Sequence, residues 1–483
     1  MVTAADRAAK EDGYIPYSKR PYWTVSRSEW TAPVLFMLSM ALLGLSFYPA
    51  VLAVLFLIVQ AYRQDRYNMI IMLTLFAGAY GYISENAVGV KNGDLFLAIA
   101  VVLMFVYIKP PLVRRTMVVL GLYAAALLVL ASFSLESMSV QMITLRYYLM
   151  FAFFIIPIVC FTREDFDMHI FFRRVMQYVM IVSVFYIVDA IFLGANVLVP
   201  QTYSWSGEAL TFTSIRIAPF SILRKYPPGL YIVFMAVYPL ARFYRLRVWQ
   251  WLLIGVAILT TQTFTLVSAI ILAFIICQGR LRQLLKWTFI GVGSFLLLFA
   301  LDSVLPERKI DEETHSALRI RSTYDQFVDV LDAVDVEDVA KFASGRMAQI
   351  IPKVELVNRE GKQWTGLGFL HPEKTKIARY FIDNEYYVDV AKSYELAFGV
   401  ENAPVQIWLT IGYIGLFVHI LFLYALYRVV RRLKYCGYFL SMLFIGVWMG
   451  LSGWFTLISM HGLIMLALSY SVVLLANINK AER

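Results

Sequence analysis

Cysteine is almost absent from this 483-residue chain, and histidine is scarce. Cys160 and Cys277 lie in apolar runs and Cys436 in a basic stretch, so the sequence predicts neither a disulfide nor a thiolate metal site. The five histidines include no pair with metal-ligand spacing, which predicts that the protein binds no metal ion. No glycine-rich loop followed by Lys-Ser or Lys-Thr occurs, so we expect no nucleotide and no other cofactor.

Charged residues are also few. They make up 16% of the chain, whereas 60% of the residues are hydrophobic, and the mean hydropathy is +0.67. Such a composition is foreign to soluble proteins, and only helices and closed barrels satisfy their backbone polar groups in lipid. The apolar runs are long and continuous rather than alternating, which excludes a barrel. The predicted fold class is therefore an all-α polytopic membrane protein.

Apolar runs recur along most of the chain. A membrane-spanning helix needs about 20 apolar residues, and we expect about 14 (12–14) transmembrane helices. The candidate runs are Ala32–Phe47, Tyr48–Tyr62, Met69–Ala87, Leu95–Ile108, Thr116–Phe133, Met142–Phe161, Val175–Gly194, Pro228–Ala241, Trp249–Thr260, Thr263–Cys277, Leu284–Leu301, Pro404–Tyr427, Tyr438–Gly453 and Phe455–Ala476. The polar N-terminal stretch lacks an apolar core, so no cleaved signal peptide is expected.

Clusters of Arg and Lys set the expected orientation, because such clusters favour the cytoplasmic side. We place the clusters at 63–66, 109–115, 173–174, 242–247, 280–282 and 428–434 in the cytoplasm. Two stretches between clusters must then be helical hairpins, with turns near Tyr48-Pro49 and near Thr260-Thr261-Gln262. Both termini are expected to be cytoplasmic.

Two polar intervals are expected on the outer side. The larger, from Pro306 to Asn402, holds 13 Lys and Arg and 18 Asp and Glu, a net −5 in a chain of net +10. The positive excess thus lies in short inner loops, which excludes a nucleic-acid partner. Hydrophobic spacing at 327–334 and 387–398 predicts amphipathic helices within this loop. The expected parts are an N-terminal tail (1–31), a transmembrane body (32–304) with a smaller outer loop (195–227), the large loop (305–403), C-terminal transmembrane helices (404–477) and a tail (478–483).

Arg346 is the first candidate for chemistry in the large loop. Ser344 can cap a helix that begins near Arg346, so a guanidinium and backbone amides could face one anion. An arginine fork suits the oxygens of phosphate or diphosphate. The plainer alternative is a loop arginine that pairs with one of the many nearby carboxylates. Glu401 and Asn402, before the next run, form a candidate base at a desolvated edge or simply a polar helix start.

Arg224 is the second candidate cation. It precedes Lys225 where the smaller loop returns to the membrane, and Pro227 and Pro228 would fix that geometry. An interfacial cation that only snorkels is the alternative. Arg216 is a weaker cation on the same side, and His371 lies in the large loop. We expect Asp189, Glu85 and Asp302, in or near apolar runs, to lie in the outer leaflet within reach of water.

These motifs resemble the O-antigen ligase and O-antigen (Wzy-type) polymerase superfamily of bacterial envelope glycosyltransferases. Ala343-Ser344-Gly345-Arg346, followed by Trp364-Thr365-Gly366-Leu367-Gly368-Phe369, looks like the family's loop signature. Glu401-Asn402 with Gln406–Leu409 and Ile411–Leu416 resembles its His-Asn segment that enters a span ending in Gly-x-x-Gly. Arg224, with Pro227 and Gly229, resembles the arginine at the base of the preceding periplasmic loop.

The resemblance implies a metal-independent, GT-C-like transferase that uses an undecaprenyl-diphosphate-linked glycan on the periplasmic side. Arg224 and Arg346, with Lys225 and Arg216, would bind the diphosphate, and Ser344, Gly345, Asn402, Gly366 and Gly368 would support the site. The chain departs from the family pattern at Glu401, where ligases carry His, and at Thr260–Thr265, where a Ser-x-Arg segment is absent. Both departures favour a polymerase.

We therefore predict a polymerase of lipid-linked repeat units for an exopolysaccharide, a capsule or O-antigen. Glu401 is the candidate base and His371 its rival. The alternatives are an O-antigen ligase that acts on another acceptor and, in a different class, a flippase or transporter of lipid-linked oligosaccharide. Membrane lipid, a chain-length regulator and a flippase are the expected partners.

Overall fold

The computed structural model describes most of the helical body of the chain. The described residues are 17–43, 46–79, 92–107, 110–134, 136–161, 166–199, 215–217, 220–222, 225, 228–261, 263–278, 293, 296–297, 299–305, 308–310, 313–315, 321, 354, 357–369, 403–451 and 457–478. The chain divides into two compact units. The first unit comprises Met1–Ala125, Arg146–Gly279 and His419–Arg483, and the second comprises Ala126–Leu145 and Arg280–Val418.

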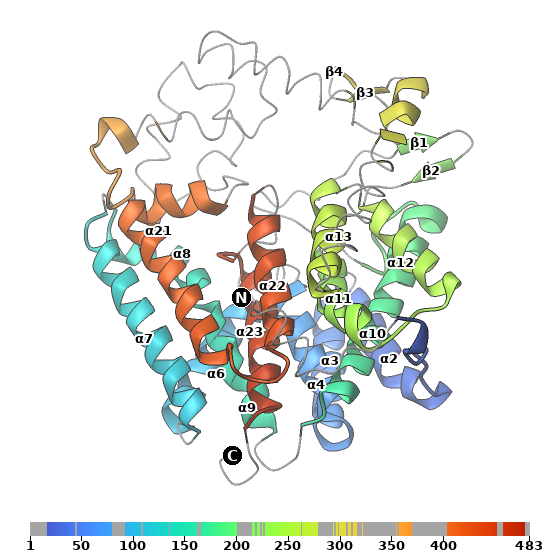
Figure 1. Ribbon diagram of the computed structural model, residues 1–483, viewed down its shortest axis with the longest axis horizontal. Helices are drawn as coiled ribbons and strands as arrows, with labels where there is room; N and C mark the ends of the chain where they lie inside the picture. Colours follow the sequence, from blue (N-terminus) through green and yellow to red (C-terminus); the bar gives the residue numbers. More distant parts are fainter. Residues whose placement is uncertain are drawn as a thin grey trace. The chain divides into compact units, whose positions relative to one another are not determined.

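Helices dominate the described residues (Figure 1). The α-helices are α2 (Thr31–Leu42), α3 (Phe47–Gln64), α4 (Arg66–Thr74), α6 (Asn92–Val106), α7 (Pro111–Ala131), α8 (Met138–Tyr148), α9 (Ile155–Cys160), α10 (Met168–Ile187), α11 (Ile232–Arg242), α12 (Val248–Thr260), α13 (Phe264–Gln278), α21 (Ala403–Val430), α22 (Cys436–Gly450) and α23 (Met460–Leu475). Shorter helical turns are η1 (Tyr17–Lys19), η2 (Arg27–Trp30), η3 (Leu75–Ala79), η4 (Met150–Phe154), η5 (Val188–Leu193) and η6 (Pro228–Tyr231).

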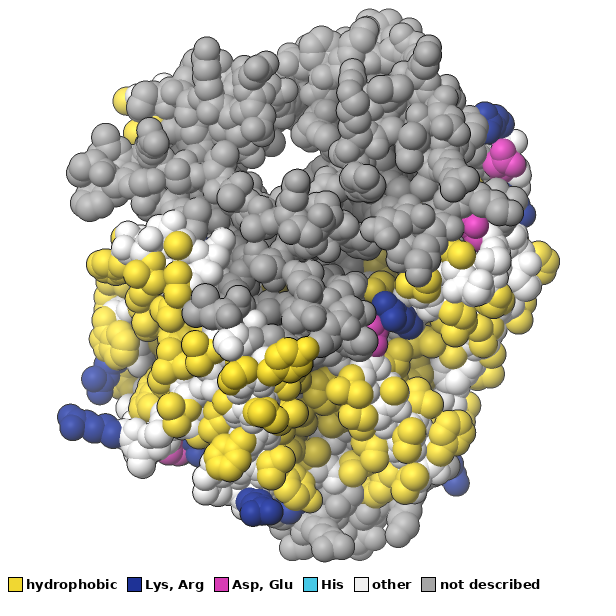
Figure 2. Space-filling model, turned by 180° about the vertical axis from the view of Figure 1, so that it is seen from behind, with side chains coloured by type: hydrophobic (Ala, Val, Ile, Leu, Met, Phe, Trp, Pro, Cys, Tyr) yellow, Lys and Arg dark blue, Asp and Glu magenta, His cyan; other side chains and the backbone are white. Residues whose placement is uncertain are grey.

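Several helices have the length and apolarity of membrane spans, as the composition predicts. Within the described residues, α7, α10 with η5, and α21 pass this test, and the bent pair of α8 with η4 and α9 would make a fourth. A further seven apolar helices are 10–17 residues long. Apolar side chains cover much of the described surface (Figure 2), and Phe105 is 80% exposed. A lipid environment explains such exposure.

The expected number of about 14 full-length spans is not what these helices show. Many predicted runs form helices that are shorter than about 20 residues, or that break within the run. The run from Met142 to Phe161 breaks at Leu149, between α8 and η4. The part of the run before this break carries Arg146, whereas the part after it is apolar throughout, and hydropathy averaged over the whole run does not locate the break.

Both predicted hairpin stretches do divide into two helices. The turn between α12 and α13 lies at Thr261 and the residue after it, as predicted. The turn between α2 and α3 ends at Ser46, earlier than the predicted Tyr48-Pro49. Pro49 instead occupies the first turn of α3, where the missing N–H costs no helical hydrogen bond.

The core of the first unit is built around α10, α11 and α23. Every residue of α11 and of α23 is buried, whereas α3 exposes Leu52 and Phe56. Helix α10 packs on α11 and α12, and α22 packs on both α13 and α23. Aromatic rings fill the contact between α10, α11 and α22, where the ring centroids of Phe172 and Tyr438 are 5.2 Å apart. Buried aromatic pairs of this kind stabilise the packing beyond their buried area.

Two short antiparallel hairpins stand apart from the helical prediction. Strands β1 (Ile215–Ile217) and β2 (Phe220–Ile222) pair in the smaller polar interval, and β3 (Arg308–Ile310) and β4 (Glu313–His315) pair in the larger one. Three-residue strands give little hydropathy signal, so the sequence did not reveal them. The amphipathic helices predicted at 327–334 and 387–398 lie outside the described residues.

Some of the segments that the sequence assigns to the cytoplasm lie together in the first unit. Arg174, at the start of α10, pairs with Glu29 (2.8 Å) and with Asp65 (2.7 Å). The main chain of Trp23 donates to Arg245, whose guanidinium lies over the ring of Tyr22. These contacts join the N-terminal segment to two of the predicted inner segments, 173–174 and 242–247, and join 173–174 to a third, 63–66. They agree with the predicted order of inner and outer segments, while the orientation itself stays a prediction.

Glu29 makes this cluster sensitive to pH. Burial alone would raise the pKa of Glu29, but hydrogen bonds from Ser26 and the charge of Arg174 lower it from 4.5 to about 2. The carboxylate therefore stabilises the folded state above pH 4.5, and this contribution is lost as the pH falls from about 4.5 to about 2. We expect Glu29→Gln to lower the unfolding temperature at neutral pH and to flatten its decline over that acidic interval.

Thermal unfolding of the detergent-solubilised chain across pH 2–7 would measure this effect. Glu360→Gln, in an exposed turn, is the matched control and should leave the wild-type profile unchanged. Parallel profiles for wild type and Glu29→Gln would show that the Glu29 carboxylate contributes nothing to stability.

Candidate functional site

Four of the predicted site residues lie in the part of the chain that the structure describes. Lys225 belongs to the first unit, Gly366 and Gly368 belong to the second, and Arg216 lies in β1 with its side chain outside the description. The remaining candidates lie outside the described residues: Arg224, Ser344, Gly345, Arg346, His371, Glu401 and Asn402. The site can therefore be built from the elements that lead to these residues.

Helix α21 is broken near its N-terminal end. Gly412 has φ 65° and ψ −170°, far from helical values, so the helical hydrogen bonds across it cannot form. A break of this kind leaves carbonyls before it and amides after it without partners, which is costly in an apolar environment. Gly412 is the residue that allows the break, since this backbone conformation is essentially restricted to glycine.

The segment Gln363–Gly368 supplies partners for the groups freed by the break. Its amides donate to carbonyls before Gly412, and its carbonyls accept from amides after it. The four bonds are Leu367 N to Leu409 O (2.8 Å), Gly368 N to Thr410 O (2.8 Å), Tyr413 N to Gln363 O (3.0 Å) and Ile414 N to Trp364 O (3.2 Å). We call Gln363–Gly368, bound in this way across the break in α21, the clasp.

The clasp requires close approach of two backbones. A Cβ atom on Gly412 would overlap the carbonyl of Trp364, and one on Gly366 would overlap the carbonyl of Thr410. Gly366 also has φ 74°, in the left-handed region. Gly366 therefore lets the loop lie against α21, while its supporting role in a catalytic site stays a prediction.

Ser134, after α7, and Gln141, in α8, hold the clasp from a second direction within the same unit. The Ser134 hydroxyl donates to Leu367 O (2.8 Å), and the Gln141 side-chain oxygen accepts from Phe369 N (3.3 Å). A Cβ on Gly368 would overlap the Ser134 hydroxyl. Leu367 and Phe369 are buried, so the segment is anchored by packing as well as by hydrogen bonds.

An aromatic pair marks the exposed side of the clasp. Trp364 is 65% exposed and Tyr413 is 50% exposed, with their ring centroids 5.6 Å apart. Trp408 approaches Tyr413 at the same centroid distance. Such amphipathic rings suit a position at a membrane surface, where one edge is wet and the other apolar.

Lys225 is buried in the first unit rather than held at the membrane surface. Its Nζ donates to Asp189 (2.8 Å), to Asn196 Oδ1 (2.6 Å) and to Val199 O (3.1 Å), and both charged side chains are fully buried. Its main-chain N–H donates to Thr260 O at the end of α12. All three ammonium donors are therefore used inside the protein. This geometry argues against the predicted role of Lys225 as a diphosphate ligand.

Asp189 completes this buried centre from η5. Its carboxylate accepts from the amides of Val197, Leu198 and Val199 as well as from Lys225. Burial lowers the pKa of Lys225, and the hydrogen bond and charge of Asp189 oppose that shift. The expectation that water reaches Asp189 and Asp302 is wrong, because they are 0% and 2% exposed; Glu85 lies outside the described residues.

Sequence reasoning missed that Asp189 and Lys225 are partners. The signal was present, since an ionisable residue in an apolar run calls for a partner of opposite charge. Asp189 lies near the end of one predicted span and Lys225 lies just before the start of the next, so only the fold could show that they are partners.

The comparisons with known proteins add no support to the resemblance, which rests on the motifs alone. No protein-family model matches the chain, and a search of the curated proteins gives no match. Among the described residues, no group of three or more His, Cys, Asp or Glu side chains could hold a metal ion.

Proposed function

We propose that the protein is a membrane glycosyltransferase that polymerises undecaprenyl-diphosphate-linked repeat units of an exopolysaccharide, a capsule or O-antigen. The observation that supports this proposal most is the clasp. Three of its four main-chain hydrogen bonds join the Trp364–Phe369 segment to the Gln406–Leu416 segment. These are two of the three segments on which the resemblance rests, and they are distant in the sequence.

The proposed reaction uses residues that the clasp and the buried centre lead to. Arg346 precedes the clasp in the large loop, Glu401 lies two residues before the start of α21, and Arg224 directly precedes Lys225 in the sequence. The two arginines would bind the diphosphate and stabilise the charge on the departing group. The acceptor hydroxyl would attack the anomeric carbon with inversion, lose its proton to Glu401 or His371, and displace the lipid diphosphate.

The architecture proposed for this reaction is GT-C-like, with both termini in the cytoplasm and the large loop on the periplasmic face of the inner membrane. A membrane lipid environment, a flippase and a chain-length regulator are the proposed partners. The apolar exposed faces of the helices support the membrane location.

Substitution of the two arginines tests the proposal. We expect Arg346→Ala and Arg224→Ala each to reduce polymer about 100-fold or more, because each removes donors aimed at developing negative charge. Lipid-linked single repeats should accumulate on the periplasmic face. The measurement scores polymer and lipid-linked repeats at equal protein level, and Arg321→Ala, at an exposed position, is the control. Normal polymer in both variants would eliminate the proposed site.

Transport of lipid-linked oligosaccharide is the second candidate function. Broken helices and buried charges inside the membrane body are typical of transporters, and α21 and the Asp189–Lys225 pair show these two features. The same arginine variants separate the two functions. If lipid-linked repeats accumulate on the cytoplasmic face in these variants, transport is favoured. If the wild-type protein transfers a single repeat to an acceptor other than the lipid carrier, the ligase alternative is favoured.

A further inference from the structure

The N-terminal segment Tyr17–Trp30 crosses the predicted cytoplasmic ends of two helices of the first unit. Its regular structure is limited to the short turns η1 and η2 and a bridge from Tyr22 to Arg245. We call Tyr17–Trp30 the strap. A segment with so few hydrogen bonds within itself keeps its place through contacts with other segments, and these contacts reach both α11 and α10.

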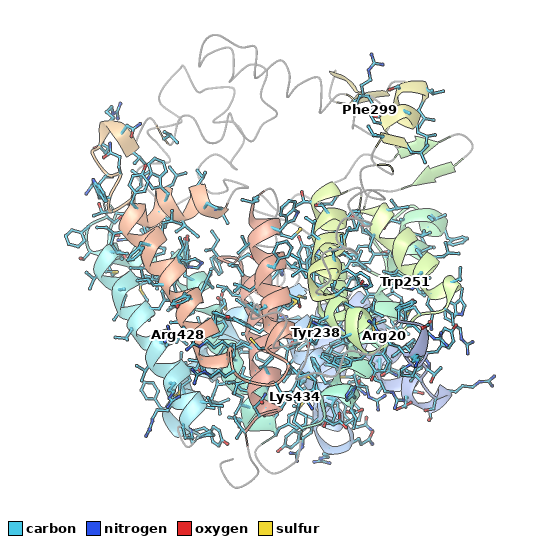
Figure 3. The ribbon with its side chains drawn as sticks, viewed as in Figure 1. Arg20, Tyr238, Trp251, Phe299, Arg428 and Lys434 are labelled. Atoms are coloured by element: carbon cyan, nitrogen blue, oxygen red, sulfur yellow. The ribbon has the colours of Figure 1, made fainter. Side chains whose placement is uncertain are left out.

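At the end of α11 the strap places a buried guanidinium. Arg20 is 2% exposed, and its Nη1 donates to Leu240 O in the last turn of the helix (3.0 Å; Figure 3). The carbonyls of a last turn have no partner within the helix, and the negative end of the helix dipole favours a cation. Two main-chain bonds follow, from Trp23 N to Arg245 O (3.0 Å) and from Arg245 N to Pro21 O (3.1 Å). The strap is thus bonded to α11 and to the residues after it.

At the start of α10 the strap is held by a buried indole and a carboxylate. The Trp23 ring is buried, and its Nε1 donates to Arg173 O (3.3 Å). The Glu29 carboxylate accepts from Arg173 (3.3 Å) and Arg174 (2.8 Å), and its main-chain oxygen accepts from Gln177 Nε2 (3.3 Å). Because Trp23 is bonded here and to the residues after α11, it joins the two helix ends directly.

Two native cysteines lie buried near the same end of α11, which packs on α13 and α22. Cys277 is the last residue but one of α13, and its thiol lies within electrostatic range of Arg242 at the end of α11. Cys436 begins α22, and the residue after it, Gly437, packs against the Tyr238 ring of α11. A movement of the last turns of α11 would therefore uncover both thiols, which makes them natural reporters of this end of the unit.

We propose that the strap is a lock that keeps the predicted cytoplasmic ends of α10 and α11 together. Separation of the two ends would withdraw the Arg20 guanidinium and the Trp23 indole from buried hydrogen bonds, which is costly. A transporter with alternating access must open this end in one of its states, whereas a transferase that takes its substrate from the outer side works with it closed. The lock does not rest on the proposed glycosyl transfer, because its test measures thiol exposure and not polymer.

Labelling of the native thiols with a maleimide tests the lock in the full-length chain in non-ionic detergent. Arg20→Met removes the guanidinium and Trp23→Phe removes the indole donor, and both keep a large apolar side chain. Labelling of a buried thiol follows the population of the open form. We therefore expect Cys277 and Cys436 to react about tenfold faster in Arg20→Met, and about threefold faster in Trp23→Phe, than in the wild type. Lys19→Met, which changes an exposed residue of the strap, should react like the wild type.

Cys160, the last residue of α9, is the reference within the same molecule, because its carbonyl is bonded to Arg66 outside the strap. Its labelling rate should stay at the wild-type value in every variant. An equal rise at all three cysteines would indicate general loosening of the fold, and unchanged rates at Cys277 and Cys436 would show that the strap holds nothing. Either result would overturn the proposal.

Hydrogen exchange of the wild type is a second check that needs no variant to fold. The amides of Trp23 and Arg245, which join the strap to the residues after α11, should exchange as slowly as the amides within α11. Exchange of these two amides at the rate of an open peptide would show that the strap is detached in solution, and the proposal would then be wrong.

Discussion

Replacing Gly412 by alanine is expected to destabilise the second unit by about 3–5 kcal/mol. A non-glycine residue in this backbone conformation costs about 1–3 kcal/mol. The new methyl group would also overlap the Trp364 carbonyl and force the clasp away from α21. Each of the four hydrogen bonds of the clasp contributes a net of about 1 kcal/mol to stability. Their loss would also leave backbone amides and carbonyls of α21 unpaired in apolar surroundings. Gly366→Ala should act similarly, because its methyl group would overlap the Thr410 carbonyl.

Gly361 and Gly121 provide matched controls for this prediction. Gly361 has a similar left-handed φ of 62° but open space around it, so Gly361→Ala should cost only about 1–2 kcal/mol. Gly121 lies in α7 with nothing near it, and Gly121→Ala should be neutral or stabilising. Limited proteolysis and thermal unfolding in detergent would compare the four variants. If Gly412→Ala were as stable as Gly361→Ala, the clasp would contribute nothing to the fold.

The clasp also carries a functional expectation. If it positions the two segments for glycosyl transfer, Gly412→Ala and Gly366→Ala should lose polymer at a temperature where the protein is still folded. Gly361→Ala should keep polymer, although it lies in the same turn region. Loss of stability without loss of polymer would restrict the clasp to a structural role and separate it from the proposed site.

The sequence predicted the apolar body well because hydropathy is a local property. The hairpin turn at Thr261 and the helical character of the described apolar runs follow from composition and charge, whereas the number of full-length spans does not. It predicted Gly366 and Gly368 as supporting residues, but not the break at Gly412. The residues around Gly412 read as one continuous apolar helix, and the break is stable only because a distant loop supplies its hydrogen bonds. A contact of that range leaves no periodic trace in the sequence.

The role of Lys225 was predicted from its position and not from its partner. A lysine beside an arginine at a membrane edge has the pattern of a ligand for an anion. Its environment decides otherwise, because Asp189, Asn196 and Val199 take all three ammonium donors. Burial and pairing are properties of the fold, so the chemistry of an ionisable residue is the least predictable part of the site.

Lys225→Met is expected to destabilise the first unit by about 3–5 kcal/mol. The substitution leaves the fully buried Asp189 carboxylate without its cation, which costs far more than the pair itself contributes. Asp189→Asn, added to Lys225→Met, removes that charge while an amide oxygen can still accept from Val197–Val199. The double variant should therefore recover part of the loss, and the coupling is measured by a double-mutant cycle of thermal unfolding. Lys434→Met, outside this centre, should change stability by less than about 1 kcal/mol.

The double variant also distinguishes an anchor from a ligand. If Lys225 only anchors the chain that carries Arg224, polymer should return as stability returns, since the diphosphate never touched the ammonium group. If Lys225 binds the diphosphate, polymer should stay absent in a double variant that unfolds near the wild-type temperature. The three internal acceptors of the ammonium group make the first outcome the expected one. Lys225 would then be a structural anchor, and the proposed diphosphate site would rest on its arginines alone.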